Sequence, residues 1–160
     1  MEDIMIRRFK VEDAKEGSAL IKRTLYEVNS KDYEDRFLED SSIQLSENDL
    51  IERAEKNNYY ICEENEKIVG IGGIGSYCGK EDEAYIMSVF VLPEYIGKGI
   101  GRNIVETLEK DEYALRGNRI EVASSITAVG FYKEMGYRFK NNDSRLNEVE
   151  QNYRMEKFLK

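Results

Sequence analysis

Apolar and polar positions alternate in short blocks along the chain, and charged or glycine-containing turns separate the blocks. Apolar runs of strand length predict strands at residues 4–9, 59–63, 68–77, 83–92, 119–124, 137–140 and 153–158. Apolar positions at helical spacing predict helices after Asp13, at 32–39, after Ser46, from the glycines near 100 to residue 115, and at 127–134. Hairpins in the middle and strand–helix alternation in the second half predict an α/β fold, with a mixed central sheet flanked by helices.

Local signals refine these boundaries. Ser46 followed by Asp49 resembles a capping box, and Gly117 is a plausible helix stop. The strand at 68–77 contains four glycines, which is unusual for a strand interior and indicates a bulge or a close approach by another group. The polar residues 141–151 predict a mobile loop.

The strand that ends at Pro93, the only proline, leads into a glycine turn with Gly97, Gly99 and Gly101. A glycine turn that opens a helix leaves backbone N–H groups unpaired at the positive end of the helix dipole. This predicts a site for a phosphate or a pyrophosphate. The dinucleotide fingerprint Gly-x-Gly-x-x-Gly does not fit, because Arg102 stands at the position of its third glycine. The Gly-Lys-Ser/Thr of a nucleotide-binding loop is also absent.

Length and composition limit the number of domains, the kinds of partner and the expected location of the protein. The 160 residues predict a single domain, 1–160, and the net charge of −8 argues against nucleic acid or an anionic membrane as partner. The acidic start and the lack of a long apolar run predict neither a signal peptide nor a membrane span, so a cytoplasmic location is expected. Two cysteines suffice neither for a disulfide framework nor for a structural zinc site, and no metal is expected.

The chain has no histidine. This excludes Ser-His and Cys-His nucleophile systems and histidine acid–base catalysis. Any catalysis must therefore use carboxylates, tyrosines, serines, lysines or backbone dipoles, which suits direct transfer between two bound substrates.

The segment from Val89 to Arg102, together with residues 131–137, resembles the GNAT family of acetyl-CoA-dependent N-acetyltransferases. The resemblance implies a GNAT-like sheet that splays between strands 4 and 5. It also implies acetyl-CoA as acetyl donor without a metal, and direct attack by a primary amine in a ternary complex. The acceptor is a small-molecule or peptide amine, and homodimers are frequent in the family.

The resemblance further implies which residues bind the cofactor. Backbone N–H groups of the glycine turn should hold the pyrophosphate, although Ile96 stands where the family usually has Gln or Arg. The bulged strand should pair with the pantetheine arm, and Ser125 should either contact that arm or cap the next helix through Ala128. The expected cofactor-binding residues are Val89, Phe90, Val91, Gly97, Lys98, Gly99, Ile100, Gly101, Arg102 and Ser125.

Tyr132 matches the family's proton donor to the departing thiolate, the alternative being a core aromatic. Glu83 is the first candidate for the general base, with Tyr85 and Ser88 as further candidates on the same strand. Glu121 is a weaker candidate, and water alone is another alternative.

The region expected over the acceptor is acidic, with interleaved aromatic residues such as Tyr33 and Phe37. Such a wall favours a cationic amine, and the alternative is a set of solvated helix faces. The acidic residues are Glu27, Asp32, Glu34, Asp35, Glu39, Asp40, Glu47 and Asp49. Two alternative functions remain: a non-catalytic CoA-binding sensor or assembly module, and transfer of a longer acyl group.

Overall fold

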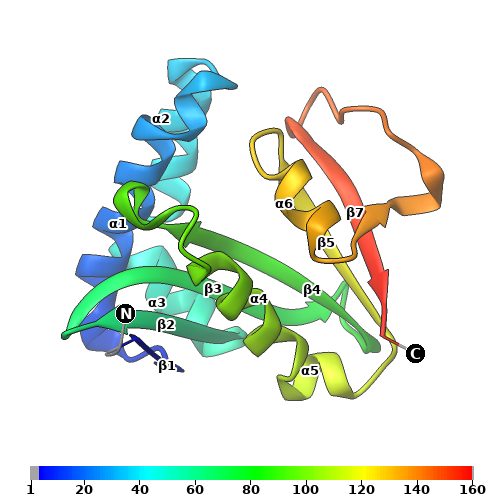
Figure 1. Ribbon diagram of the computed structural model, residues 1–160, viewed down its shortest axis with the longest axis horizontal. Helices are drawn as coiled ribbons and strands as arrows, with labels where there is room; N and C mark the ends of the chain where they lie inside the picture. The colour runs from blue at the N-terminus through cyan, green and yellow to red at the C-terminus, as the bar shows by residue number, and fades with distance from the viewer. Residues whose placement is uncertain (1–3, 160) are drawn as a thin grey trace.

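The protein is described by a computed structural model that covers residues 4–159, and its sheet has seven strands (Figure 1). The strands are β1 Ile4–Arg8, β2 Asn58–Glu64, β3 Lys67–Tyr77, β4 Lys80–Val91, β5 Arg119–Ser125, β6 Arg138–Phe139 and β7 Asn152–Phe158. The helices are α1 Ala14–Glu27, α2 Asp35–Gln44, α3 Glu47–Lys56, α4 Ile100–Glu109, α5 Glu112–Leu115 and α6 Val129–Glu134. The strand order is β1-β2-β3-β4-β5-β7-β6.

The central feature of the sheet is the divergence of β4 from β5. These strands are parallel and pair only from Glu83 opposite Arg119 to Ile86 opposite Val122. Beyond Ile86 they separate, so the sheet opens like a V between the arm of β1–β4 and the arm of β5–β7 (Figure 1). The other strand pairs described are antiparallel. The predicted mixed sheet, splayed between its fourth and fifth strands, is therefore confirmed.

The glycines of β3 are places of close approach. A Cβ added to Gly70 or Gly72 would lie 2.7 or 2.6 Å from a side-chain carbon of Ile104 on α4. On the other face, a Cβ added to Gly73 would meet the ring of Tyr59 at 2.6 Å. The predicted close approach is thus made by packed side chains, and side chains of α4 lie directly against the backbone of β3.

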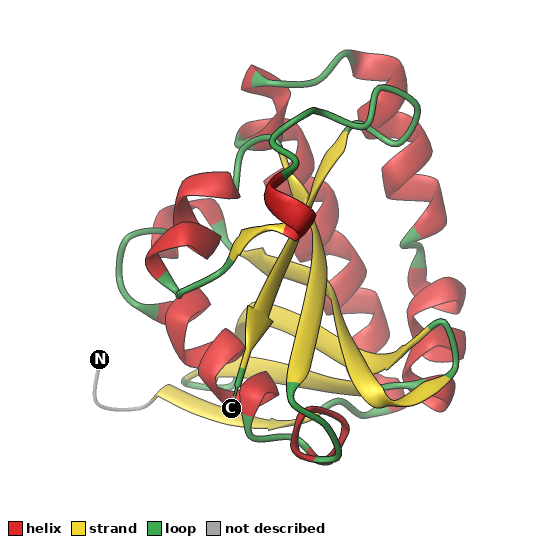
Figure 2. Cartoon of the chain, turned by 90° about the vertical axis from the view of Figure 1, so that its right-hand side faces the viewer, coloured by secondary structure: helices red, strands yellow, loops and turns green. Residues whose placement is uncertain are grey.

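Helices cover both faces of the sheet (Figure 2). Alternation along β3 directs Ile71 toward Gly17 of α1 and its neighbour Gly72 toward α4, so α1 and α4 pack on opposite faces. No helix within residues 4–159 has the length and apolar character needed to cross a membrane.

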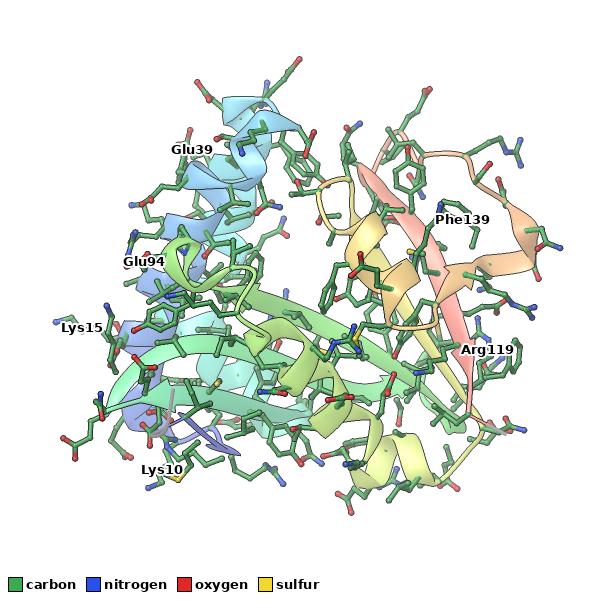
Figure 3. The ribbon with its side chains drawn as sticks, viewed as in Figure 1. Lys10, Lys15, Glu39, Glu94, Arg119 and Phe139 are labelled. Atoms are coloured by element: carbon green, nitrogen blue, oxygen red, sulfur yellow. The ribbon has the colours of Figure 1, made fainter. Side chains whose placement is uncertain are left out.

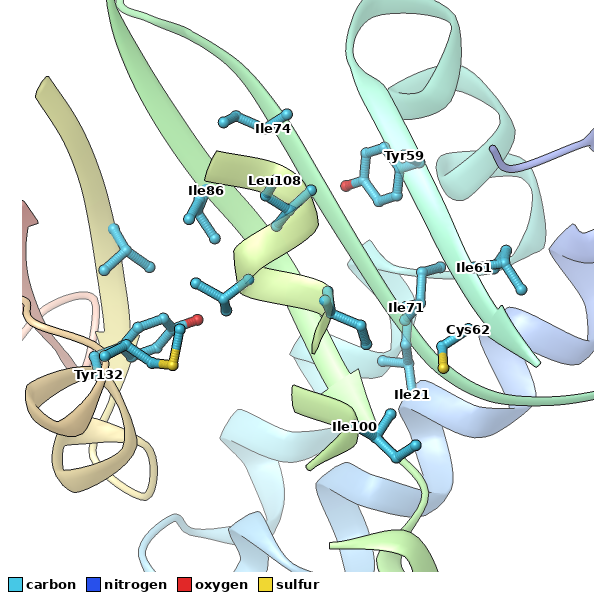
Figure 4. Close-up of a cluster of buried hydrophobic side chains, with 14 of the residues drawn as sticks. Ile21, Tyr59, Ile61, Cys62, Ile71, Ile74, Ile86, Ile100, Leu108 and Tyr132 are labelled. Carbon is cyan, nitrogen blue, oxygen red and sulfur yellow. The ribbon is translucent and has the colours of Figure 1, made fainter. Parts of the chain in front are cut away.

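The hydrophobic core joins the sheet to these helices (Figure 4). Ile71, Ile74 and Ile86 of the sheet, with Leu108 of α4, are almost fully buried. Cys62 is also fully buried, and burial raises the pKa of its thiol to about 11. A thiol with that pKa is almost entirely protonated near pH 7, which fits its expected role as a core residue.

Two local predictions are wrong. The helix expected to reach residue 115 ends at Glu109, because the carboxylate of Asp111 accepts a hydrogen bond from the N–H of Tyr113 (2.8 Å) and begins α5. The helix α3 does start after Ser46, but the hydroxyl of Ser46 donates to the carboxylate of Asp49 (2.8 Å) and does not cap the backbone.

Candidate active site

A β-bulge interrupts β4 where it leaves β5. The register with β3 shifts between Gly73 opposite Met87 and Ile71 opposite Phe90, so two residues of β4 face one of β3. Ser88 has φ = +57°, a left-handed conformation that is uncommon for a residue other than glycine. Its hydroxyl lies 2.8 Å from the hydroxyl of Tyr59, which fixes the bulge. The edge of β4 beyond the bulge therefore faces the opening of the V without a neighbouring strand on that side.

The glycine turn follows directly. Gly97 and Gly99 have φ of +84° and +85°, a backbone conformation that favours glycine, and Gly99 is the residue before α4. The N–H groups in the first turn of α4, from Ile100 to Arg102, have no carbonyl partner within the helix. Gly101 lies against the ring of Phe131 on α6, where an added Cβ would sit 3.2 Å from a ring carbon. The turn thus presents backbone donors between α4 and α6.

The bulge and the glycine turn border one cleft of about 690 Å³ between the two arms of the sheet. Most of the expected site residues line it: Val89, Phe90, Val91, Gly97, Gly99, Gly101, Arg102, Ser125 and Tyr132. The side chain of Ile100 instead packs in the core, and the ammonium of Lys98 lies over the ring of Tyr95, 5.2 Å from its centroid.

Two of these residues have distinct local surroundings. The carbonyl oxygen of Val91 already accepts a hydrogen bond from the hydroxyl of Thr24 (2.9 Å), so this group is occupied within the protein. The hydroxyl of Ser125 accepts a hydrogen bond from the N–H of Ala128 (3.2 Å). The expected contact between Ser125 and the start of α6 is therefore present.

Tyr132 is one of the residues that line the cleft, and only 5% of its surface is exposed. Its ring packs edge-to-face against Phe131 and Tyr137, and no residue within 4–159 hydrogen-bonds its hydroxyl. Burial, with a smaller effect from Tyr85, raises the pKa of Tyr132 well above its usual value. The side chain is therefore a neutral phenol that packs as a core aromatic and also lines the cleft.

The structure places Glu83 outside this cleft. It lies in a separate hollow of about 510 Å³ at the closed end of the V, and its carboxylate pairs with Arg119 at 2.9 Å. Arg119 is labelled at that end of the sheet in Figure 3, far from α2 and the glycine turn. Lys80 also approaches Glu83, at 3.7 Å. A carboxylate held this way is remote from the bulge and already neutralised.

Glu121 is buried and held by three cations. Arg119 and Arg154 contact its two carboxylate oxygens at 2.5 and 3.1 Å, and Lys140 lies at 3.0 Å. Burial acts to raise the pKa of Glu121, but hydrogen bonds from Arg119 and Lys140 outweigh burial and leave the pKa below its usual value. Glu121 is thus a weak base, and its oxygens are occupied.

On the side expected for the acceptor, Tyr33 bridges the two arms. Its hydroxyl accepts from the N–H of Ile126 (2.7 Å) and donates to the carbonyl of Gln151 (2.9 Å). Its ring stacks on Phe37, with centroids 4.4 Å apart. Both aromatic residues line the cleft, whereas the acidic residues of this region do not. Glu39, labelled in Figure 3, points outward from α2. This direction fits the alternative in which the acidic residues form solvated helix faces.

Sequence reasoning missed several residues that line the cleft, among them Met87, Glu150 and Asn152. The helix predicted over 32–39 begins only at Asp35, so Tyr33 lies in the bend before α2 and its ring stacks on Phe37 of that helix. Nothing local marks Glu150 or Asn152, because β7 brings them to the cleft from the far end of the chain.

A sheet splayed beside a bulged strand and a glycine turn defines an acetyltransferase fold. The model of the acetyltransferase (GNAT) domain matches residues 16–157, and the chain belongs to the GNAT family. No curated protein matches the chain at a significant level.

Solved structures agree on the fold. The PaiA N-acetyltransferase of Thermoplasma acidophilum, in complex with coenzyme A, has a TM-score of 0.81 at 18% identity and covers 97% of this chain and 98% of its own. A GCN5-related N-acetyltransferase of Rhodopseudomonas palustris has a TM-score of 0.79 at 22% identity, with 97% and 95% covered. An aminoglycoside 6'-N-acetyltransferase complexed with coenzyme A has a TM-score of 0.71 at 15% identity, with 98% and 97% covered.

Proposed function

We propose that the protein transfers the acetyl group of acetyl-CoA to a primary amine by direct attack in a ternary complex. The observation that carries the proposal is the bulge at Ser88, placed where β4 leaves β5 and continuous with the glycine turn. The glycine turn offers N–H groups to the linked phosphates, and the free edge of β4 beyond the bulge offers backbone groups to the amides of the pantetheine arm. Membership of the GNAT family supports acetyl-CoA as the donor.

In the reaction, the amine nitrogen forms a bond to the thioester carbon while the carbon–sulfur bond breaks. Backbone N–H groups near the bulge stabilise the charge that develops on the carbonyl oxygen. Tyr132 gives its proton to the departing thiolate, the attacking nitrogen releases its surplus proton to water, and the phenolate of Tyr132 regains a proton from solvent. A phenol whose pKa is raised by burial remains an effective donor here, because the same dry surroundings raise the pKa of the thiol.

The amine must first lose a proton, which costs about 4 kcal/mol at pH 7 for an amine of pKa near 10. Because Glu83 and Glu121 are paired with cations, we assign this proton to water beside the hydroxyls of Tyr85 and Ser88, which line the cleft. The rate should then follow the free-amine fraction.

The test is a panel of primary amines with acetyl-CoA, reading release of free thiol. Turnover with at least one amine, and a product acetylated on nitrogen, supports the proposal. Binding of CoA without turnover across the panel would favour the non-catalytic sensor, and faster turnover with longer thioesters would favour another acyl donor.

A further inference from the structure

One arginine lines the cleft without a carboxylate partner. Arg53, in the last turn of α3, is half-buried and borders the cleft. It takes part in none of the salt bridges within residues 4–159. The buried side-chain polar atom that lacks a hydrogen bond in this part of the chain is Oδ1 of Asn152, so no nitrogen of Arg53 is both buried and unpaired. The N–H groups of Arg53 that the protein does not use are therefore open to solvent.

The surroundings of Arg53 place it close to the bulge at Ser88. Burial raises the pKa of the Tyr59 hydroxyl, whereas the hydrogen bond with Ser88 and the positive charge of Arg53 act to lower it. The guanidinium therefore lies near that hydroxyl, which is 2.8 Å from the hydroxyl of Ser88. The backbone agrees, because the carbonyl of Arg53 accepts hydrogen bonds from the backbone N–H and the side-chain amide of Asn57 (3.0 Å each). Asn57 in turn packs against Gly75 of β3, beside β4.

Arg53 and the glycine turn lie on opposite faces of the sheet. A Cβ added to Gly17 of α1 would lie 3.6 Å from Leu50 of α3 and equally far from Ile71 of β3, so α3 packs on the same face as α1. The glycine turn leads into α4, which packs on the other face. Phosphates held at the turn are thus remote from Arg53, and the pantetheine arm along β4 carries no charge. The cofactor leaves this guanidinium without a counter-ion.

The helical wall of the cleft carries a positive charge. Among the residues of α1, α2 and α3 that line the cleft, all of them in the described part of the chain, Arg53 alone is charged. The acidic residues of the cleft, Glu134 and Glu150, belong to the opposite arm, and Glu150 lies 3.7 Å from Arg154. A guanidinium without a counter-ion suits a carboxylate, which accepts two parallel hydrogen bonds from its planar fork. The wall therefore favours an anionic group on the acceptor over a second cationic one.

We propose that Arg53 binds a carboxylate of the acceptor, which makes the acceptor an amino acid and not a simple alkylamine. The inference rests on the proposed function. The reacting nitrogen must reach the bulge where β4 leaves β5, and a single hydroxyl, that of Tyr59, lies between Arg53 and the bulge. The amine and the carboxylate must then be only a few atoms apart, as they are in an amino acid. The stacked rings of Tyr33 and Phe37 in the same cleft suit an apolar or aromatic side chain.

The experiment measures binding of two N-acetylated compounds to the protein saturated with CoA, by isothermal titration calorimetry. N-acetyl-L-phenylalanine and N-acetyl-L-phenylalaninamide differ only in a carboxylate against a neutral amide, and neither has an amine that can be protonated. We expect the acid to bind about tenfold more tightly, equivalent to about 1.4 kcal/mol. Arg53→Gln should remove this preference and leave the affinity for CoA unchanged.

Two further variants complete the test. Arg36→Gln is the matched control, because Arg36 is an exposed cation of α2 outside the cleft, and this variant should keep the tenfold preference. Arg53→Lys keeps the charge but loses the planar fork, so the preference should fall to about threefold. Circular dichroism checks that each variant is folded, and Arg53→Lys carries the test if the glutamine variant is not.

Equal affinities for the two compounds, no heat with either, or an undiminished preference in both Arg53 variants would overturn the inference. An equal loss of preference in Arg36→Gln would also overturn it, because the effect would then come from net charge alone. A loss of CoA affinity in Arg53→Gln would show that Arg53 serves the cofactor instead, and would overturn it too. A titration with CoA alone and the amine panel test the proposed function separately, so the two failures are distinguishable.

Discussion

Replacing Tyr132 with phenylalanine removes one hydroxyl and leaves the packing of the ring intact. No residue within 4–159 hydrogen-bonds that hydroxyl, and the ring is held edge-to-face by Phe131 and Tyr137. The substitution therefore breaks no hydrogen bond within the protein, and we expect the free energy of unfolding to change by less than about 1 kcal/mol.

The effect on turnover should be large. A positioned proton donor typically contributes a factor of 10² to 10⁴, so kcat should fall at least about 100-fold, or about 2.7 kcal/mol in the barrier. The affinity for CoA should be unchanged, since the predicted phosphate and pantetheine contacts come from the backbone. The release of free thiol, measured in samples quenched at fixed times, gives kcat, and calorimetry gives the CoA affinity.

Tyr137→Phe is the matched control. Its hydroxyl donates to the carboxylate of Glu109 (2.9 Å), so this variant should lose about 1 kcal/mol of stability and keep its turnover. If Tyr132→Phe retained kcat within about threefold of the parent, the assignment of the proton donor would be refuted.

Four further predictions follow from the site. Gly99→Ala forces a side chain into φ = +85°, at about 1–2 kcal/mol, and calorimetry should show CoA binding at least about tenfold weaker; unchanged affinity would contradict the phosphate site. Glu83→Gln should leave kcat unchanged, and a 100-fold loss would instead restore it as the base. Glu121→Gln removes the buried carboxylate that contacts Arg119, Lys140 and Arg154 together, although Arg119 keeps Glu83 and Glu156 as partners, and should cost about 1–3 kcal/mol in chemical denaturation; a smaller change would mean the cluster is solvated. Below the pKa of an alkylamine, kcat/KM should rise about tenfold per pH unit, and a plateau near pH 7 would reveal a protein base.

The pH dependence of stability has a definite sign. The folded-state pKa of Glu121 is depressed, so its contribution is present above its unfolded pKa and is lost as pH falls through the folded value. Asp13 behaves alike: burial acts to raise its pKa, but its pair with Arg7 and the N–H of Lys10 outweigh burial. Thermal unfolding should therefore move to lower temperature in acid, below about pH 4.

The parts of the fold that depend on local backbone chemistry could be predicted from the sequence. The glycine turn and the strand before it are contiguous, and positive φ at Gly97 and Gly99 is a requirement that the residue type itself reveals. The splay between the fourth and fifth strands came from the resemblance, and the register confirms it.

Features set by distant partners could not be predicted. The break before α5 depends on Asp111, whose carboxylate is also bound by Asn58 and by the hydroxyl of Tyr60 (2.6 Å), about fifty residues earlier. The direction of Glu83 depends on Arg119, on a strand that pairs with β4 only in the folded protein. Asn152 shows no motif at all, because the burial of its side-chain oxygen without a hydrogen-bond partner follows from three-dimensional packing.

The close packing of α4 on β3 means that two core glycines, Gly70 and Gly72, determine where the glycine turn before α4 lies, although they do not contact that turn. Because hydrogen atoms alone separate Gly70 and Gly72 from Ile104, the height of α4 above the sheet is fixed by their lack of a side chain. The turn that precedes α4 moves with it, so one added methyl group at Gly72 would shift the backbone donors of the proposed phosphate site away from the bulge. The affinity for the cofactor that we propose therefore depends also on β3, through its packing against α4.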